Sequence, residues 1–184
     1  MAAARSGTVR PSRFVTRESL ENGIASVAAT GGSTNGVLHL LAIAHEFGAI
    51  ADRTPIVADM HPGGRYQAAD LYDAGGMELV MRELLKRDGL LHGDAPTVDG
   101  RTIAEIAAAA RETEGQKVVV PIETPIKASG GLAILHGSLA PDGCVVKLAG
   151  HERKLHRGPA RVFDSETACP RPSRSAASFP ATSS

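Results

Sequence analysis

Residues 16–35 read TRESLENGIASVAATGGSTN, and this stretch decides how the N-terminal part of the chain is predicted to fold. A helix is predicted from Thr16 to about Ala29, because Val15 and Leu20 have the spacing of a hydrophobic staple. Two glycines end this helix, and a second helix is predicted to start within the STN sequence that follows. The stretch therefore predicts two helices joined by a glycine turn.

Outward from this stretch, predicted helices and short strands indicate an α/β fold class. The second helix is expected to end at Gly48, and residues 56–58 are interpreted as a short buried strand. Two further helices are predicted over residues 76–87 and from Thr102 onward, where Glu105 completes a capping box. Short β-type runs separated by Pro and Gly follow at residues 118–122, 132–135, 144–148 and 160–163.

Three segments of the chain differ in composition. Residues 1–115 are interpreted as a mainly helical part of an α/β domain, and residues 116–166 as the start of a β-domain. Residues 167–184 are rich in Pro and Ser and have no hydrophobic periodicity, so they are predicted to be disordered. The change after residue 166 is abrupt, and we interpret this tail as an out-of-frame or foreign end.

Composition excludes several classes of function. Lys plus Arg and Asp plus Glu both number 20, so the net charge gives no electrostatic case for binding nucleic acid or an anionic membrane. No apolar run approaches the roughly 20 residues of a membrane-spanning helix. The two cysteines, Cys144 and Cys169, form neither a disulfide framework nor a cluster with metal-binding spacing. These features favour a cytoplasmic protein.

Seven motifs occur in an order that is typical of one enzyme family. The motifs are GGSTN with VLHL (31–40), RTP (53–55), DL with AGG (70–76), GLLHGD (89–94), PIK (125–127), GGLAIL with LAPDG (130–143) and GPARVFD (158–164). With these motifs, across about residues 11–166, the chain resembles the dihydroxy-acid and sugar-acid (phosphogluconate-type) dehydratases, and its C-terminal motifs are closer to the dihydroxy-acid branch.

The resemblance implies a fold and a reaction. The chain would contain the C-terminal part of the family's α/β N-terminal domain, followed by the start of its β-barrel-like domain. The family consists of hydro-lyases that remove water from a 2,3-dihydroxy acid to give a 2-keto acid, in the biosynthesis of valine, leucine and isoleucine. The implied cofactors are an iron–sulfur cluster, which acts as a Lewis acid, and Mg²⁺. A serine removes the proton, and the enzyme is a homodimer.

The residues that perform this chemistry in the family are not found in this sequence. No cysteine precedes Cys144, the family's magnesium ligands lie upstream, and its GRFSGG motif with the serine base does not occur. Residues 49–52 also form a shorter link than the family has, which we interpret as an internal deletion. We therefore interpret the chain as an internal fragment with no catalytic residue and no metal ligand, inactive on its own. The alternatives are a fragment of a phosphogluconate-type dehydratase and a non-catalytic binding domain.

The GGSTN motif is the best candidate for contact with substrate. Glycines before a helix expose backbone N–H groups, and the positive helix N-terminus favours an anion such as the carboxylate of the implied substrate. Gly32, Ser33, Thr34 and Asn35 are the candidate substrate-binding residues. The alternative, which we favour, is a tight turn in which Ser33 or Thr34 caps the following helix.

Other polar residues are interpreted as structural. The Lys127 side chain is either facing a ligand or a charge on a surface loop, and we favour the surface loop. Arg65 and Asp70 are expected to form a surface ion pair of little energetic weight. Cys144 is expected to be a small buried hydrophobic residue rather than a ligand. The histidines are scattered along the chain, so no metal-binding role is assigned to them.

Overall fold

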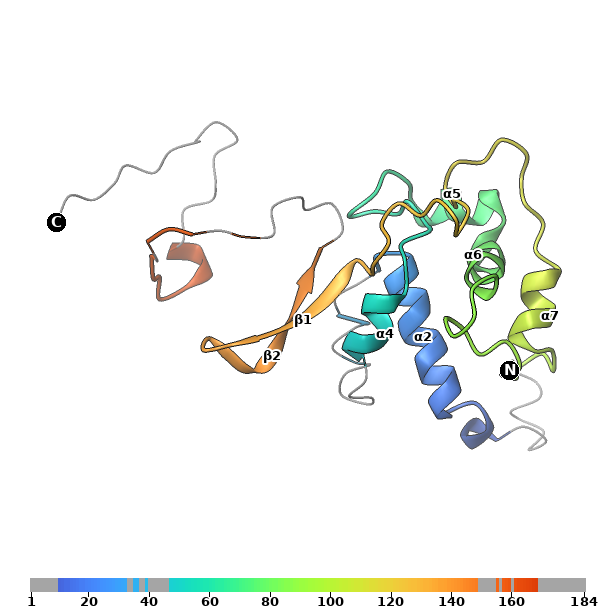
Figure 1. Cartoon of the computed structure of the whole chain (residues 1–184), viewed down its shortest axis with the longest axis horizontal. Coiled ribbons are helices and arrows are strands. Elements are labelled where there is room, and N and C mark those ends of the chain that lie inside the picture. The colour runs from blue at the N-terminus through green and yellow to red at the C-terminus, as the bar shows by residue number, and fades with distance from the viewer. Residues whose placement is uncertain are drawn as a thin grey trace. The chain divides into compact units, whose positions relative to one another are not determined.

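The computed structural model describes residues 10–32, 35–36, 39, 47–148, 155, 157–159 and 161–168. The chain divides into two units, Met1–Glu152 and Arg153–Ser184. The first unit holds the α-helices and a two-stranded antiparallel sheet (Figure 1), which confirms a mixed α/β fold. In the second unit, the described residues include one short 3-10 helix, η2 (Glu166–Ala168). The predicted domain boundary near residue 115 stays a prediction.

Helix α2 (Arg17–Ala29) follows a 3-10 turn, η1 (Pro11–Arg13), and confirms the first predicted helix. Thr16 caps it, because its side chain accepts a hydrogen bond from the backbone N–H of Ser19 at 3.2 Å. The Ser19 hydroxyl accepts from the Thr16 N–H at 3.0 Å in return, which completes a capping box. One face of α2 is buried in the core and carries Ile24, Ala25, Ala28 and Ala29.

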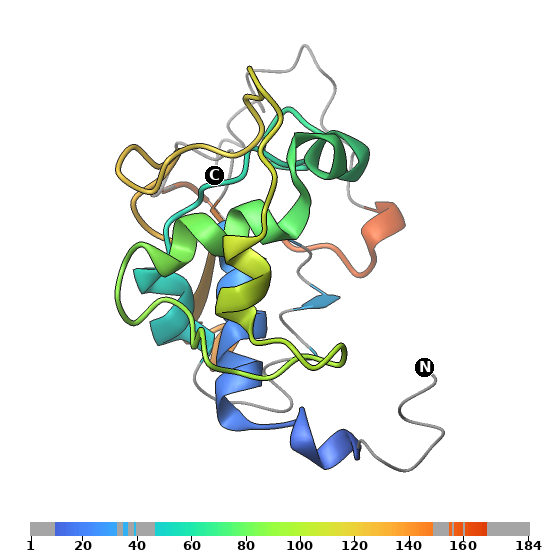
Figure 2. The ribbon, with the colours of Figure 1, turned by 90° about the vertical axis from the view of Figure 1, so that its right-hand side faces the viewer.

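Within the described residues, four further helices have defined bounds. They are α4 (Phe47–Arg53), α5 (Ala68–Ala74), α6 (Gly76–Leu85) and α7 (Ile103–Ala108), and the last two confirm predicted helices. In Figures 1 and 2, α4 lies beside α2, and α7 lies beside α6. Thr102 and Glu105 form the predicted capping box of α7. Helix α5 was not predicted.

The prediction of a helix end at Gly48 was wrong. Gly48 lies inside α4, which continues through the residues interpreted as a short link, 49–52. Ile50 and Ala51 are buried in the core, and this burial outweighs the local helix-breaking tendency of the glycine. Most of the predicted second helix, between residues 33 and 46, lies outside the described residues.

The sheet is a hairpin of β1 (Leu132–Gly137) and β2 (Ala140–Lys147), and it confirms two of the predicted β-type runs. Residues 56–58 and 118–122 do not form strands; Ala58 pairs with Val119 only in an isolated bridge. The Val57 N–H, which would continue this ladder, donates instead to the Ala29 carbonyl at 3.0 Å. Residues 161–163 also form no strand.

The buried apolar residues that the structure describes form two clusters in the first unit. The larger one joins residues 57–58 and 118–122 to α5 and α6. The smaller one joins α2 and α4 to the start of β1 and contains Ile24, Ala25, Ala28, Ile50, Ala51 and Leu132. In the described part of the chain, no helix is both long and apolar enough to cross a bilayer. Thr167 and Ala168 belong to η2, and the rest of the predicted disordered tail, from residue 169, lies outside the described residues.

Candidate functional site

The glycine turn after α2 closes the end of that helix. Gly31 has a φ angle of 56° and donates its backbone N–H to the Ala28 carbonyl at 3.2 Å. The Gly32 N–H donates to the Val27 carbonyl at 2.8 Å. Together these two bonds form a Schellman motif, in which a left-handed residue after the helix satisfies its last carbonyls.

This geometry corrects the expected role of the glycine N–H groups. Those of Gly31 and Gly32 are bonded to α2, so they do not face a ligand. Asn35 is exposed and helical, while Ser33 and Thr34 lie outside the described residues. The predicted substrate-binding motif therefore stays a prediction, and it requires a donor other than the N–H groups of its glycines.

A second group at this turn is the Lys147 side chain, at the end of β2. Its ammonium Nζ donates a hydrogen bond to the Gly32 carbonyl at 3.0 Å, across 115 positions of the chain. The side chain is half-buried, and burial lowers the pKa of the Lys147 ammonium below its ordinary value. Sequence reasoning missed Lys147; the available signal was one charge at the end of an otherwise apolar run, residues 144–148.

Packing fixes the position of Lys147. Its register partner on β1 is Leu132, which is fully buried in the smaller core cluster. The backbone N–H of Leu148 donates to the Gly131 carbonyl at 2.6 Å, which continues the hairpin beyond the strand end. The ammonium is therefore held at the glycine turn by a strand that is itself packed against α2 and α4.

The GLLHGD motif, residues 89–94, is attached to α2 by a separate polar cluster. The His92 N–H donates to the Asn22 Oδ1 at 2.7 Å, and the Asn22 Nδ2 donates to the His92 carbonyl at 3.0 Å. The His92 imidazole Nε2 lies 2.6 Å from the Glu21 Oε2. Asn22 is buried, so this motif has a structural role in joining the loop to the helix.

The structure tests the interpretations of Arg65 and Cys144, and for Lys127 it gives the place of the backbone. Arg65 pairs with Asp59 and not with Asp70, whose carboxylate instead accepts the Gln67 N–H at the start of α5. Cys144 is exposed, so its interpretation as a buried residue was wrong; its register partner on β1, Leu135, is exposed as well, so the core does not cover this part of the hairpin. The Lys127 carbonyl accepts the Ile56 N–H at 2.9 Å in an isolated bridge.

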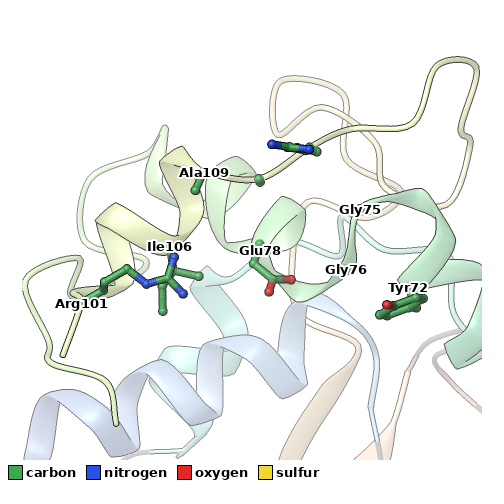
Figure 3. A pocket seen from close by; sticks show the side chains of 9 residues that line it. Tyr72, Gly75, Gly76, Glu78, Arg101, Ile106 and Ala109 are labelled. Carbon is green, nitrogen blue, oxygen red and sulfur yellow. The ribbon is translucent and has the colours of Figure 1, made fainter. Parts of the chain in front are cut away.

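A pocket of about 310 Å³ lies between the start of α6 and the edge of α7 (Figure 3). Tyr72, Glu78, Arg101 and Ile106 are among its lining residues. The guanidinium of Arg101 is already bonded to the Asp99 carboxylate. None of the residues predicted to bind substrate lines this pocket.

Comparisons with known proteins place both halves of the chain in one family. Residues 1–106 match the description "Dihydroxy-acid/6-phosphogluconate dehydratase N-terminal", and residues 117–176 match the corresponding C-terminal description. The chain belongs to this dehydratase family. The resemblance inferred from the seven motifs is thereby confirmed.

Individual relatives of this dehydratase chain are named dihydroxy-acid dehydratase. A protein of Koribacter versatilis is 58% identical over 167 residues, which are 86% of the chain and 29% of the relative. A Roseiflexus protein is 54% identical over 169 residues, 87% of the chain and 30% of the relative. A Thermus thermophilus protein is 54% identical over 169 residues, which are 86% of the chain and 30% of the relative. The chain thus spans less than a third of the length of these dehydratases.

The described residues of the dehydratase chain do not fit either of the cofactors that the resemblance implied. An iron–sulfur cluster is held by several thiolates, whereas Cys144 is one exposed residue and Cys169 lies outside the described part. Within the described residues, no three His, Cys, Asp or Glu side chains are grouped to hold a metal ion. No catalytic step is therefore assigned to these residues.

The two glycines of the turn are expected to respond differently to substitution. Gly31→Ala should lower the free energy of unfolding by about 1–2 kcal/mol, because its positive φ is strained for any residue with a Cβ. Gly32→Ala should change it by less than about 0.5 kcal/mol, because an added Cβ has its nearest neighbours at 3.4 Å. Urea denaturation of both variants measures the difference; equal losses would contradict the turn geometry.

The Glu21–His92 contact predicts a pH dependence of stability. Hydrogen bonds from His92 and then Arg17 lower the pKa of the Glu21 carboxyl below its ordinary value of 4.5. A carboxyl whose folded-state pKa is lowered stabilises the fold above the unfolded pKa, and this contribution disappears as pH falls through the folded value. Glu21→Gln should therefore lower the free energy of unfolding by about 1 kcal/mol at pH 7 and by much less at pH 3. Urea denaturation at both pH values tests this; an equal loss at both would contradict it.

Proposed function

We propose that this chain forms part of a dihydroxy-acid dehydratase, which removes water from 2,3-dihydroxy-3-methyl acids to give 2-keto acids for branched-chain amino-acid biosynthesis. The identity of 48–58% to proteins of that name, over 86–88% of the chain, is the observation that carries the proposal. Hydro-lyase chemistry follows from the family as a class. Within such an enzyme, the chain contributes a segment that helps to bind the substrate.

Within this function, the glycine turn and the motif that follows it form the substrate-binding side of the segment. Gly32 and Asn35 belong to this motif together with Ser33 and Thr34. The closeness of the Lys147 ammonium to the Gly32 carbonyl supports this placement, because positive charge at the turn attracts a carboxylate. The iron–sulfur cluster, Mg²⁺ and the proton-abstracting serine are supplied by other parts of a homodimeric cytoplasmic enzyme. The 184-residue chain alone is therefore inactive.

The test is an exchange of homologous segments. Residues 10–168 of this chain replace the matching segment of the Thermus thermophilus relative, which is 54% identical to it. The chimera should form 2-keto acid from 2,3-dihydroxy-3-methylbutanoate, whereas the 184-residue chain alone should form none under the same reconstitution with iron, sulfide and Mg²⁺. A chimera that folds and carries the host's cofactors but has no turnover would contradict the proposal.

A second chimera serves as the matched control. The corresponding segment of the Koribacter versatilis relative, which is 58% identical to this chain, is placed in the same host. If this control chimera is active and the first chimera is inactive, the loss of turnover comes from the sequence of this chain and not from exchanging segments as such. The family description also names 6-phosphogluconate dehydratases, so both chimeras are assayed with 6-phosphogluconate as well. Turnover of that substrate alone would favour the sugar-acid branch.

A further inference from the structure

The Lys147 ammonium lacks a counter-ion in the described part of the chain. Its one hydrogen bond there goes to the neutral Gly32 carbonyl, and no ion pair joins it to a charged group of α2, α4 or β1. An ammonium carries three N–H donors, so two remain for other partners. A half-buried cation without a neighbouring carboxylate is costly, and that cost falls when an anion binds.

The surroundings of this cation fit a carboxylate better than a second cation or an apolar group. The N–H groups of Gly31 and Gly32 are used by the end of α2, whereas the Lys147 ammonium keeps two N–H donors that no described residue accepts. Burial lowers the pKa of the Lys147 ammonium, and no carboxylate among the described residues pairs with it. The buried register partner Leu132 holds the β2 backbone in place while the side chain reaches the turn.

We propose that Lys147 binds the carboxylate of the substrate, with one N–H on the Gly32 carbonyl and another on a carboxylate oxygen. This assignment rests on the proposed function and adds to it the group that recognises the acid. Lys147 thereby joins the two matched regions of the family, because Gly32 lies in the N-terminal region and Lys147 in the C-terminal one.

Equilibrium binding tests the assignment without requiring turnover. Calorimetric titration of the Thermus-host chimera with 2,3-dihydroxy-3-methylbutanoate should show about tenfold weaker binding for Lys147→Met, the size expected for one charge-assisted hydrogen bond. Lys147→Arg keeps the charge and should restore most of the affinity. Lys117→Met removes an exposed lysine of the same region and should leave the affinity unchanged. Unchanged affinity of Lys147→Met, or equal weakening by Lys117→Met, would overturn the assignment.

The pH profile separates recognition by charge from a structural role. Since burial lowers the pKa of the Lys147 ammonium, the parent chimera should lose affinity for the acid as pH rises toward the ordinary lysine value of 10.5. The Lys147→Arg variant stays charged and should lose less. Parallel profiles would overturn the assignment. If the acid binds in this manner but no chimera turns it over, the proposed function fails while the role of Lys147 stands.

Discussion

Replacing Gly130 with alanine is expected to lower the free energy of unfolding by about 3 kcal/mol, the upper end for overpacking in a well-packed interior. A Cβ at Gly130 would overlap the Ala51 carbonyl oxygen and lie 2.8 Å from its carbonyl carbon. Both partners are backbone, and Ala51 is fully buried in α4, so neither can move aside cheaply. The GGLAIL motif therefore begins with a glycine because helix and hairpin approach each other closely here.

Chemical denaturation of the chain measures this loss, and Gly137→Ala is its matched control. Gly137 lies at the far end of β1, and an added Cβ there has no neighbour within 4 Å. The control should change the free energy of unfolding by less than about 0.5 kcal/mol. Similar effects of the two substitutions would show that α4 and the hairpin do not meet as described.

Replacing Asn22 with alanine is expected to cost about 2 kcal/mol of unfolding free energy, because it leaves two backbone groups of His92 without their partner. The Asn22 amide accepts the His92 N–H and donates to the His92 carbonyl, and it is buried where water reaches poorly. The loss should be concentrated in the loop that carries the GLLHGD motif. Urea denaturation gives the total cost.

Amide hydrogen exchange locates the effect of Asn22→Ala. Protection of the His92 amide should fall, because its acceptor is removed. The Ala104 amide lies in α7 and donates to the Gly93 carbonyl of this loop at 2.8 Å; it serves as a control and should keep its protection. If the His92 amide keeps its protection as well, the asparagine does not hold the loop.

Local signals explain which elements the sequence predicts correctly. Thr16 and Thr102 cap their helices with side chains three residues from their partners, and the glycines after α2 form the turn that their order indicates. Such contacts join residues that are close in the sequence, so the local residue pattern is enough to predict them. Helix α4 was predicted wrongly at Gly48, because burial of Ile50 and Ala51 depends on β1, about 80 positions away.

The candidate site was only partly predictable for the same physical reason. The GGSTN motif stood out through composition and order, and the turn at Gly31 formed as its sequence indicates. Two features of the site depend on the folded backbone. The glycine N–H groups bond to carbonyls of α2, and the Lys147 ammonium bonds to the Gly32 carbonyl across 115 positions of the chain. Only folding brings this ammonium to the turn, and no local pattern around Lys147 specifies it.

A crystal structure of the chimera soaked with 2,3-dihydroxy-3-methylbutanoate tests the central claim, that the turn after α2 and the end of β2 together receive the substrate acid. We expect a carboxylate oxygen at about 2.7–3.2 Å from the Lys147 Nζ, with the Nζ still bonded to the Gly32 carbonyl. An acid bound in the enzyme with its carboxylate on other donors, and Lys147 turned away from it, would contradict the claim.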